Sequence, residues 1–261
     1  MDIPRQYNSC YKEMIHAMRI SNFNVGEKKV FIIAEIGNNH NGSFELALEM
    51  VDAATKAGAD CVKFQMRNMA SVYRKKSLSK DGEDLGTEYI LDLLERFELT
   101  TEEHQKISQH CFKNNIIYMC TPWDVDSIQI LESFNVPAYK VASADLTNLP
   151  LIDTIVATKK PIILSTGMSS ESEVQITTDF LNDRNANFVL LHCNSTYPAP
   201  FHDINLSWLE KLKKIHPLVG YSGHERGISV SLGAAALGAK VIERHFTFDR
   251  NMEGPDHPAS L

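Results

Sequence analysis

The chain has 261 residues, of which 43% are hydrophobic and 23% are charged, and its formal net charge is -7. This length accommodates one large α/β domain, and the composition is that of an ordinary globular protein. The negative charge argues against nucleic acid and anionic membranes as partners, because both favour a basic face on the protein.

Residues 1–29 form an N-terminal extension ahead of the first predicted strand. They lack the apolar h-region of a signal peptide, and no stretch of the chain reaches the roughly 18 to 20 apolar residues that a membrane span needs. The five cysteines are odd in number and include no C-x-x-C pair, which predicts buried thiols and not a disulfide framework. Together these features predict a cytoplasmic protein.

Eight short apolar runs follow, and most lack alternation, as expected for strands buried on both faces. They are VFIIAEIG (30–37), CVKFQM (61–66), IIYMCTP (116–122), AYKVAS (138–143), PIILSTG (161–167), FVLLHCN (188–194), LVGYSG (218–223) and VIERHFT (241–247). Helical patterns separate them, and Thr100 or Thr101 before Glu102 and Glu103 resembles a helix start. Eight strand–helix steps predict a (β/α)8 TIM barrel over residues 30–261. The alternative is an open doubly wound sheet, which usually has about five to seven strands.

Two connections of the predicted barrel are unusual. The segment from Arg67 to about Gly86 is long and polar, which is typical of a lid or a disordered loop. After the eighth strand about fourteen residues remain, too few for a loop and an eighth outer helix. We therefore expect an apolar groove beside the eighth and first strands, which a continuing chain, another subunit or the N-terminal segment would cover. The apolar residues of that segment are Met14, Ile15, Met18 and Ile20.

Polar residues gather at the carboxyl ends of the predicted strands, where the active site of such a barrel lies. Unpaired polar groups inside strands are costly, so their recurrence at one end indicates a binding site. Lys63 and Lys140, with hydroxyls around them, suit an anionic ligand such as a phosphate, although each lysine alone is equally well explained by snorkelling to the rim. The polar residues at these ends are Glu35, Lys63, Gln65, Thr121, Lys140, Ser143, Asp145, Ser165, Thr166, His192, Asn194, Ser195, Tyr197, Ser222, His224, Glu243, Arg244 and His245.

His224 and His245 end the seventh and eighth predicted strands, which are neighbours in a barrel. Adjacent strands lie about 5 Å apart, so the two imidazoles are within reach of one another and, with water, suit a divalent transition metal. The spacing leaves open the alternative of two hydrogen-bonded histidines without a metal.

Eight ordered segments between residues 29 and 261 resemble the N-acetylneuraminate synthase family, which includes legionaminic and pseudaminic acid synthases. They are IIAEIGNNHNG, VKFQ, CTPWD, YKVASADLTNLPLI, ILSTGMS, LLHCNSTYPAP, GYSGHERG and ERHFTFDRNMEGPDHPASL. The resemblance implies an enzyme that condenses phosphoenolpyruvate with an N-acetylated hexose aldehyde to give a nine-carbon 2-keto sugar acid and phosphate.

The resemblance also implies roles for individual residues. Those of the phosphoenolpyruvate pocket are Lys63, Thr121, Lys140, Ser143, Ser165, Ser195, Tyr197 and Ser222. His224 and His245 correspond to the ligands of a metal, usually manganese, with magnesium or cobalt as alternatives. Glu35 corresponds to the acidic residue beside the reacting carbon, and Asp145 and Asp256 to those that hold the sugar.

Two features depart from the family pattern. Trp123 stands in CTPWD where phenylalanine is usual, which we interpret as a packing change. Family members normally continue past ASL into an eighth helix, a linker and an antifreeze-like domain that reaches the partner subunit's site, and this sequence has none of these. We therefore predict a homodimer with weak sugar recognition.

The sugar that the resemblance favours is N-acetylmannosamine or a legionaminic precursor. Two other functions remain open at this point. One is a Schiff-base aldolase with Lys63 or Lys140 as its nucleophile, and the other is a barrel that binds phosphoenolpyruvate or a sugar without turnover.

Overall fold

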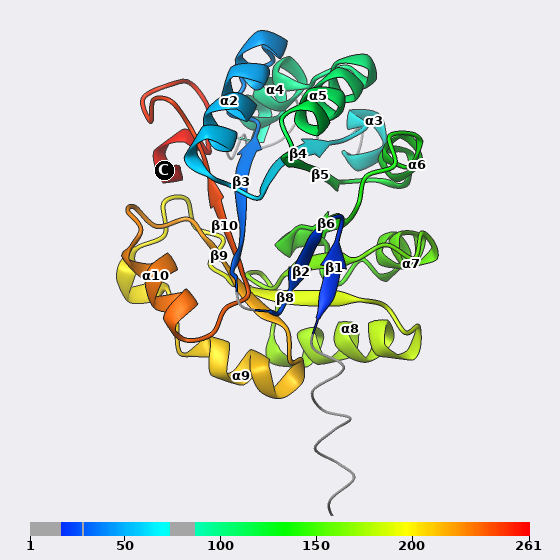
Figure 1. Cartoon of the computed structure of the whole chain (residues 1–261), viewed down its shortest axis with the longest axis vertical. Coiled ribbons are helices and arrows are strands. Elements are labelled where there is room, and N and C mark those ends of the chain that lie inside the picture. The colour runs from blue at the N-terminus through cyan, green and yellow to red at the C-terminus, as the bar shows by residue number, and fades with distance from the viewer. Residues whose placement is uncertain (1–16, 28, 74–86) are drawn as a thin grey trace, which may run out of the picture.

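Eight parallel strands close into a barrel, as the sequence predicts (Figure 1). They are β3 (Phe31–Gly37), β4 (Cys61–Met66), β5 (Ile117–Pro122), β6 (Tyr139–Val141), β7 (Ile162–Ser165), β8 (Phe188–Cys193), β9 (Val219–Gly223) and β10 (Val241–His245). The last strand, β10, pairs with both β9 and β3, so the sheet is closed and the open doubly wound alternative is excluded. The structure is a computed structural model and describes residues 17–27, 29–73 and 87–261.

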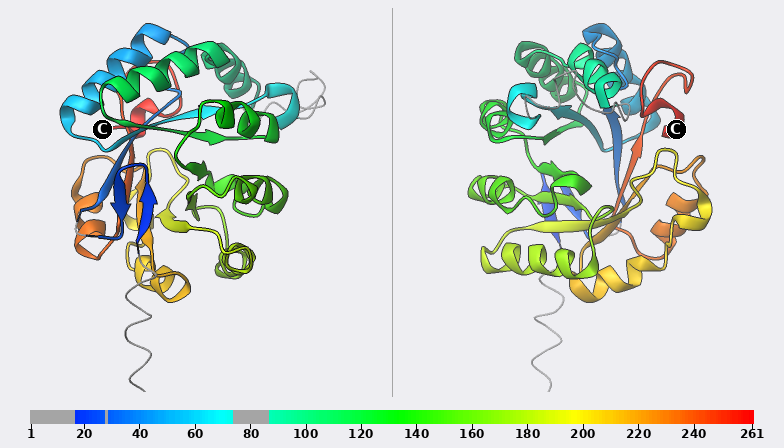
Figure 2. Two further views of the ribbon diagram at one scale, coloured as in Figure 1. Left: turned by 45° about the vertical axis from the view of Figure 1, so that its right-hand side comes forward. Right: turned by 180° about the vertical axis from the view of Figure 1, so that it is seen from behind.

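Helices follow the first seven barrel strands and surround them (Figures 1 and 2). One helix after each strand covers the barrel: α2 (Phe44–Ala57), α5 (Thr101–Lys113), α6 (Val125–Ser133), α7 (Leu149–Ala157), α8 (Glu171–Asp183), α9 (Trp208–Ile215) and α10 (Ser229–Ala236). The predicted start of α5 is confirmed, because Thr100 and Glu103 form a capping box there. The long polar connection after β4 contains one further helix, α3 (Met69–Val72), and is followed by another, α4 (Thr87–Phe97). Its residues 74–86, and with them most of the predicted lid or disordered loop, lie outside the described part of the chain.

Along most strands an apolar side chain faces the barrel interior, and a polar one faces it two positions later. The pairs include Ile33 and Glu35, Cys61 and Lys63, Met119 and Thr121, Ala138 and Lys140, Ile163 and Ser165, and Val241 and Glu243. Because side chains in a strand alternate with a period of two, both members of each pair lie on the same face. The barrel interior is therefore apolar near the strand starts and polar at the strand ends.

A short hairpin closes the apolar end of the barrel. Its strands are β1 (Met18–Ile20) and β2 (Phe23–Val25), and they lie inside the ring of strands in Figure 1. Met18 and Ile20 are buried in the same cluster as the inward-facing residues near the strand starts, since that layer would otherwise meet water. Met18 and Ile20, two of the candidates to cover a groove beside β10 and β3, are thus buried elsewhere, and the other two candidates, Met14 and Ile15, lie outside the described residues.

An apolar groove of about 400 Å³ runs along the outer face of β10 and β3, between α2 and α10. Ile32, Leu232 and Phe246 line it, and Leu232 is 63% exposed. In the described residues after β10, the only helical turn is η5 (His257–Ala259). The groove thus lies where the sequence predicts it, and its coverage by another subunit stays a prediction.

None of the helices in the described part of the chain combines the length and apolar character that crossing a bilayer requires. The four cysteines of that part, Cys61, Cys111, Cys120 and Cys193, are buried free thiols, as predicted.

The buried histidine of α5 predicts how stability depends on pH. Burial lowers the pKa of His104 from 6.5 to about 4, and its Nδ1 lies 2.9 Å from the Tyr118 hydroxyl. Its contribution to stability is therefore full above pH 6.5 and is lost as the pH falls toward 4, because the unfolded state binds the proton more tightly. In His104→Gln, the loss of unfolding free energy between about pH 7 and pH 5 should shrink by about 2 kcal/mol. Urea unfolding at both pH values measures this, and equal losses in parent and variant would contradict it.

Candidate active site

A cavity of about 190 Å³ opens at the polar ends of the barrel strands. It brings together Glu35 and all the residues that the resemblance assigns to phosphoenolpyruvate and metal. These are Glu35, Lys63, Thr121, Lys140, Ser143, Ser165, Ser195, Tyr197, Ser222, His224 and His245. They come from all eight strands and the loops that follow, so barrel closure and not local sequence assembles them.

Two buried ammonium groups lie in this cavity. Lys63 Nζ lies 2.8 Å from Glu35 Oε2 and donates to Thr121 Oγ1 at 3.0 Å. Lys140 Nζ donates to Ser165 Oγ at 2.7 Å and to a backbone carbonyl. Both lysine side chains are about 4% exposed, so neither reaches solvent by snorkelling. A desolvated pair of cations with hydroxyls beside it is suited to binding an anion of more than one negative charge.

A buried carboxylate that the sequence analysis left without a role lies between these lysines. Glu243 oxygens are 3.8 Å from Lys63 Nζ and 3.9 Å from Lys140 Nζ, and Oε1 accepts a hydrogen bond from Ser222 Oγ at 3.0 Å. Burial alone would raise the pKa of Glu243, but the two lysines outweigh it and hold that pKa below its usual value. One feature of the sequence could have assigned Glu243 to the cavity. It stands two residues before His245, so both side chains lie on the inner face of β10.

The second buried carboxylate has the opposite shift. Burial raises the pKa of Glu35 to about 7, and the Glu243 charge adds to this while Lys63 opposes it. At Lys63 burial acts to lower the pKa, but the attraction of Glu243 and Glu35 outweighs it and the pKa is raised. The pKa of Lys140 is lowered, chiefly by burial. Glu35 is therefore the carboxylate suited to exchange a proton near neutral pH.

The two acidic residues assigned to the sugar lie differently. The side chains of Glu35, Gln65 and Asp256 meet in front of Gly37. A Cβ added to that glycine would lie 3.1 Å from Glu35 Oε1, 3.2 Å from Gln65 Nε2 and 3.5 Å from Asp256 Oδ2. Asp256 is thus adjacent to Glu35, although it does not line the cavity itself. Asp145 is not among the lining residues either, and its Oδ1 accepts a hydrogen bond from Asn148 Nδ2 at 3.0 Å.

The predicted metal ligands meet across neighbouring strands. The rings of His224 and His245 lie 5.4 Å apart between centroids, and Tyr197 stacks on His224 at 3.9 Å. His224 Nδ1 lies 2.5 Å from the Asn194 carbonyl oxygen, so it donates a proton there and leaves Nε2 as a lone-pair donor. His245 Nδ1 is buried without a hydrogen-bond partner and lies 3.8 Å from Asp256 Oδ2.

Both imidazoles have the protonation state that metal binding needs. Burial lowers the pKa of His224 and of His245 to about 3, so both are neutral near pH 7. Within residues 17–27, 29–73 and 87–261, no group of three or more His, Cys, Asp or Glu side chains has the arrangement of a metal site. Two neutral imidazoles on neighbouring strands have the donor chemistry that a divalent transition metal accepts.

Two polar residues at the predicted strand ends face away from the cavity. Arg244 donates to Glu225 Oε1 at 2.8 Å and to the Gly227 carbonyl at 2.7 Å, between the barrel and α10. His192 Nε2 lies 2.6 Å from the Ile204 carbonyl oxygen. Each of these two residues is next in sequence to a residue that faces the barrel interior. Because successive side chains of a strand point to opposite faces, Arg244 and His192 point to the outer face of the barrel.

Gln65, which the sequence places among the polar strand ends, also lines the cavity, and so do Trp123, Met168 and Cys193, which were not predicted there. The indole Nε1 of Trp123 donates to Gln65 Oε1 at 3.2 Å, an interaction that phenylalanine at this position cannot make. The interpretation of Trp123 as a packing change is therefore incomplete.

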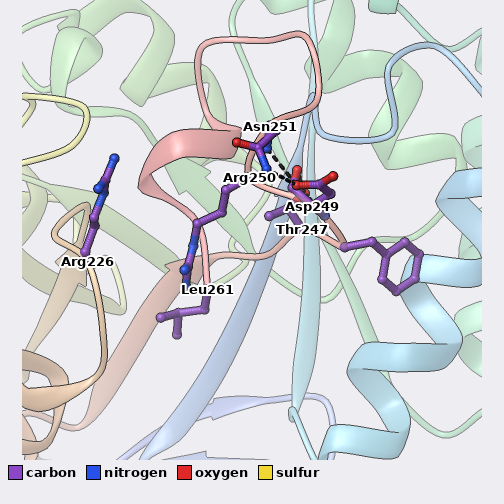
Figure 3. Close-up of a pocket in the computed structure, with 7 residues that line it drawn as sticks. Arg226, Thr247, Asp249, Arg250, Asn251 and Leu261 are labelled. Carbon is purple, nitrogen blue, oxygen red and sulfur yellow. Dashed lines mark hydrogen bonds between the residues drawn. The ribbon is translucent and has the colours of Figure 1, made fainter.

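A separate cavity of about 520 Å³ lies beside the loop after β10 (Figure 3). Asp249 Oδ1 accepts hydrogen bonds from the backbone and side-chain amides of Asn251, and Arg250 Nε donates to the Ser260 carbonyl. Arg226 stands apart from this group in the view of Figure 3. This cavity contains none of the strand-end residues, so it is distinct from the candidate active site.

Comparisons with known proteins show which family the chain resembles in sequence and in overall fold. The NeuB family model matches residues 50–261. The N,N'-diacetyllegionaminic acid synthase of Campylobacter jejuni is 43% identical over 90% of this chain and 72% of that protein. The human N-acetylneuraminate-9-phosphate synthase is 34% identical over 90% of this chain and 67% of that protein. The crystal structure of the N-acetylneuraminic acid synthetase from Leptospira borgpetersenii, in complex with citrate, has a TM-score of 0.84 at 34% identity and covers 94% of this chain and 83% of that one.

Proposed function

The chain belongs to the NeuB family, and on this premise we propose that it joins phosphoenolpyruvate, an N-acetylated hexose aldehyde and water. The products are a nine-carbon 2-keto sugar acid and phosphate. The observation that carries the proposal is the pair of buried lysines beside a neutral histidine pair in one cavity. This arrangement offers separate places for the anionic substrate and for the aldehyde oxygen.

Lys63 and Lys140 bind the phosphate and carboxylate of phosphoenolpyruvate, assisted by the hydroxyls of Thr121, Ser165 and Ser222. Charge-assisted hydrogen bonds of this kind are stronger than neutral ones, and desolvation strengthens them further. Binding adds negative charge beside Glu243, which the two ammonium groups already balance in part.

His224 and His245 hold a divalent ion, for which we propose manganese, with magnesium or cobalt as alternatives. When bound, such an ion polarises the aldehyde oxygen as a Lewis acid. The fit rests on two neutral imidazoles with available ring nitrogens, and Tyr197 keeps the His224 ring in place by stacking.

The remaining steps use the chain's own side chains. The C3 carbon of phosphoenolpyruvate bonds to the aldehyde carbon, whose oxygen takes up a proton, and positive charge develops at C2. Glu35 stabilises that charge and takes a proton from the water that adds to C2. The tetrahedral C2 then expels phosphate by cleavage of its C–O bond, and the proton of the new C2 hydroxyl passes to the departing phosphate, which leaves the 2-keto group. Lys63 and Lys140 stabilise the departing anion.

We place the sugar beside the reacting end of phosphoenolpyruvate, on the side of Glu35 where Asp256 is adjacent. We propose N-acetylmannosamine or a 2,4-diacetamido precursor of the legionaminic type as the aldehyde. The identity of 43% to a protein named as a legionaminic acid synthase, against 34% to one named as an N-acetylneuraminate-9-phosphate synthase, favours the second sugar.

The test is phosphate release from phosphoenolpyruvate with a panel of N-acetyl sugars, with and without manganese. We expect release that requires both a sugar and the ion, together with one 2-keto acid formed per phosphate. Binding of phosphoenolpyruvate without release would instead indicate a binding barrel. Borohydride trapping of a pyruvate adduct on a lysine would indicate the aldolase.

A further inference from the structure

The side-chain amide of Gln65 links the rim of the cavity to the proposed base. Gln65 Nε2 donates to Glu35 Oε1 at 3.1 Å, whereas Lys63 Nζ lies 2.8 Å from the other carboxylate oxygen, Oε2. Gln65 Oε1 accepts two hydrogen bonds, one from Trp123 Nε1 at 3.2 Å and one from Arg67 Nη2.

These partners determine which way the amide points. An indole N–H and a guanidinium are donors only, so only the carbonyl oxygen of an amide can face them. With both of its lone pairs used on that side, Gln65 must present its NH2 group to Glu35. A flipped amide would place two donors against Trp123 and Arg67 and its oxygen against a carboxylate.

The two donors are themselves held in place. The backbone amide of Trp123 donates to the Met66 carbonyl at 3.0 Å, which ties the loop after β5 to the end of β4. Arg67 Nε lies 3.3 Å from Glu98 Oε1, and its guanidinium carbon lies 5.2 Å from the centre of the Trp123 ring. The side chain of Arg67 is 2% exposed, so this arrangement is shielded from water.

We infer that Trp123 is a positioning residue, whose indole N–H fixes the Gln65 amide so that Glu35 keeps its hydrogen bond and its orientation toward the reacting carbon. The inference rests on the proposed function for the role of Glu35.

Trp123→Phe tests it, because the variant keeps an aromatic ring and loses only the donor. Loss of one neutral hydrogen bond should lower kcat about two- to tenfold and leave the KM for phosphoenolpyruvate within about twofold. Gln65→Leu should lower kcat by at least as much, and the double variant should be no slower than Gln65→Leu alone. Trp208→Phe, which changes the other tryptophan of the chain, is the matched control and should leave kcat unchanged.

A purely structural role at the cavity wall would give a different pattern, with a changed KM and additive losses in the double variant. That pattern, or a Trp123→Phe variant with the parent's kcat, would overturn the inference while leaving the proposed function intact. A second measurement needs no turnover. The NMR signals of the Gln65 side-chain amide, identified by their loss in Gln65→Leu, should shift in Trp123→Phe and not in Trp208→Phe. Unshifted signals would also overturn the inference.

Discussion

Replacing Lys140 with methionine is expected to weaken the binding of phosphoenolpyruvate by about 30-fold or more. Removing a charged hydrogen-bonding partner at a desolvated site costs about 2–5 kcal/mol, and each 1.4 kcal/mol is about tenfold in affinity. Methionine matches lysine up to the atom before the ammonium nitrogen and adds no new charge. Calorimetric titration with phosphoenolpyruvate measures the effect.

Lys140 is the cleaner of the two lysines to replace. Its ammonium group is 3.9 Å from Glu243, whereas Lys63 lies 2.8 Å from Glu35, so Lys63→Met also deprives a buried carboxylate of its cation. Lys160→Met is the matched control, because Lys160 pairs with Glu132 away from the cavity. This variant should bind phosphoenolpyruvate with the affinity of the parent. Unchanged affinity in both Lys63→Met and Lys140→Met would refute the assignment of the anion site.

The second large effect concerns the histidine pair. The double variant His224→Ala/His245→Ala is expected to lose bound manganese and to lose turnover by more than about 100-fold, since a Lewis acid is worth several kcal/mol in the transition state. Affinity for phosphoenolpyruvate should persist, because the lysines remain. Metal content after dialysis against manganese gives a readout that does not depend on activity.

His192→Ala is the control for this variant. His192 lies at the end of the neighbouring strand β8, but its ring faces away from the cavity and contacts the Ile204 carbonyl. We expect it to keep both metal and turnover. Full activity of the double variant in the presence of a chelator would show that His224 and His245 hold no functional metal.

The barrel and most of the cavity were predictable because both follow from strand periodicity. Apolar runs that end in a polar residue fix which end of each strand carries the site, and closure of the barrel then brings the polar ends together. The same rule separates Glu243, which faces inward two positions before His245, from Arg244, which faces outward to Glu225. Strand periodicity thus places Glu243 at the site, but its contacts with both lysines arise only when the barrel closes.

Other features depend on contacts between distant segments, which no local pattern records. The orientation of the Gln65 amide requires Trp123, from another strand end, and Arg67 to meet it in space. The position of Met18 and Ile20 could not be predicted for the same reason, because nothing near them in sequence shows that the open apolar end of the barrel is available to bury them.

The polar segment after β10 divides into two parts. Asp256 lies beside the cavity, 3.8 Å from the His245 ring. His257 is buried and bonded instead, with Nδ1 2.7 Å from Thr247 Oγ1 and Nε2 3.0 Å from Asn41 Oδ1. Histidine and aspartate next to one another in sequence thus have different surroundings, since His257 is bonded within the fold and Asp256 lies close to His245.

The fate of the bridging oxygen of phosphoenolpyruvate tests the central claim most directly. With this oxygen labelled as 18O, and with manganese and an accepted N-acetyl sugar present, the account predicts that the label appears in the released phosphate. The 2-keto acid should be formed in equal amount and should carry its new oxygen from water. Label retained in the keto acid, or keto acid formed from pyruvate without phosphate release, would contradict the proposed condensation.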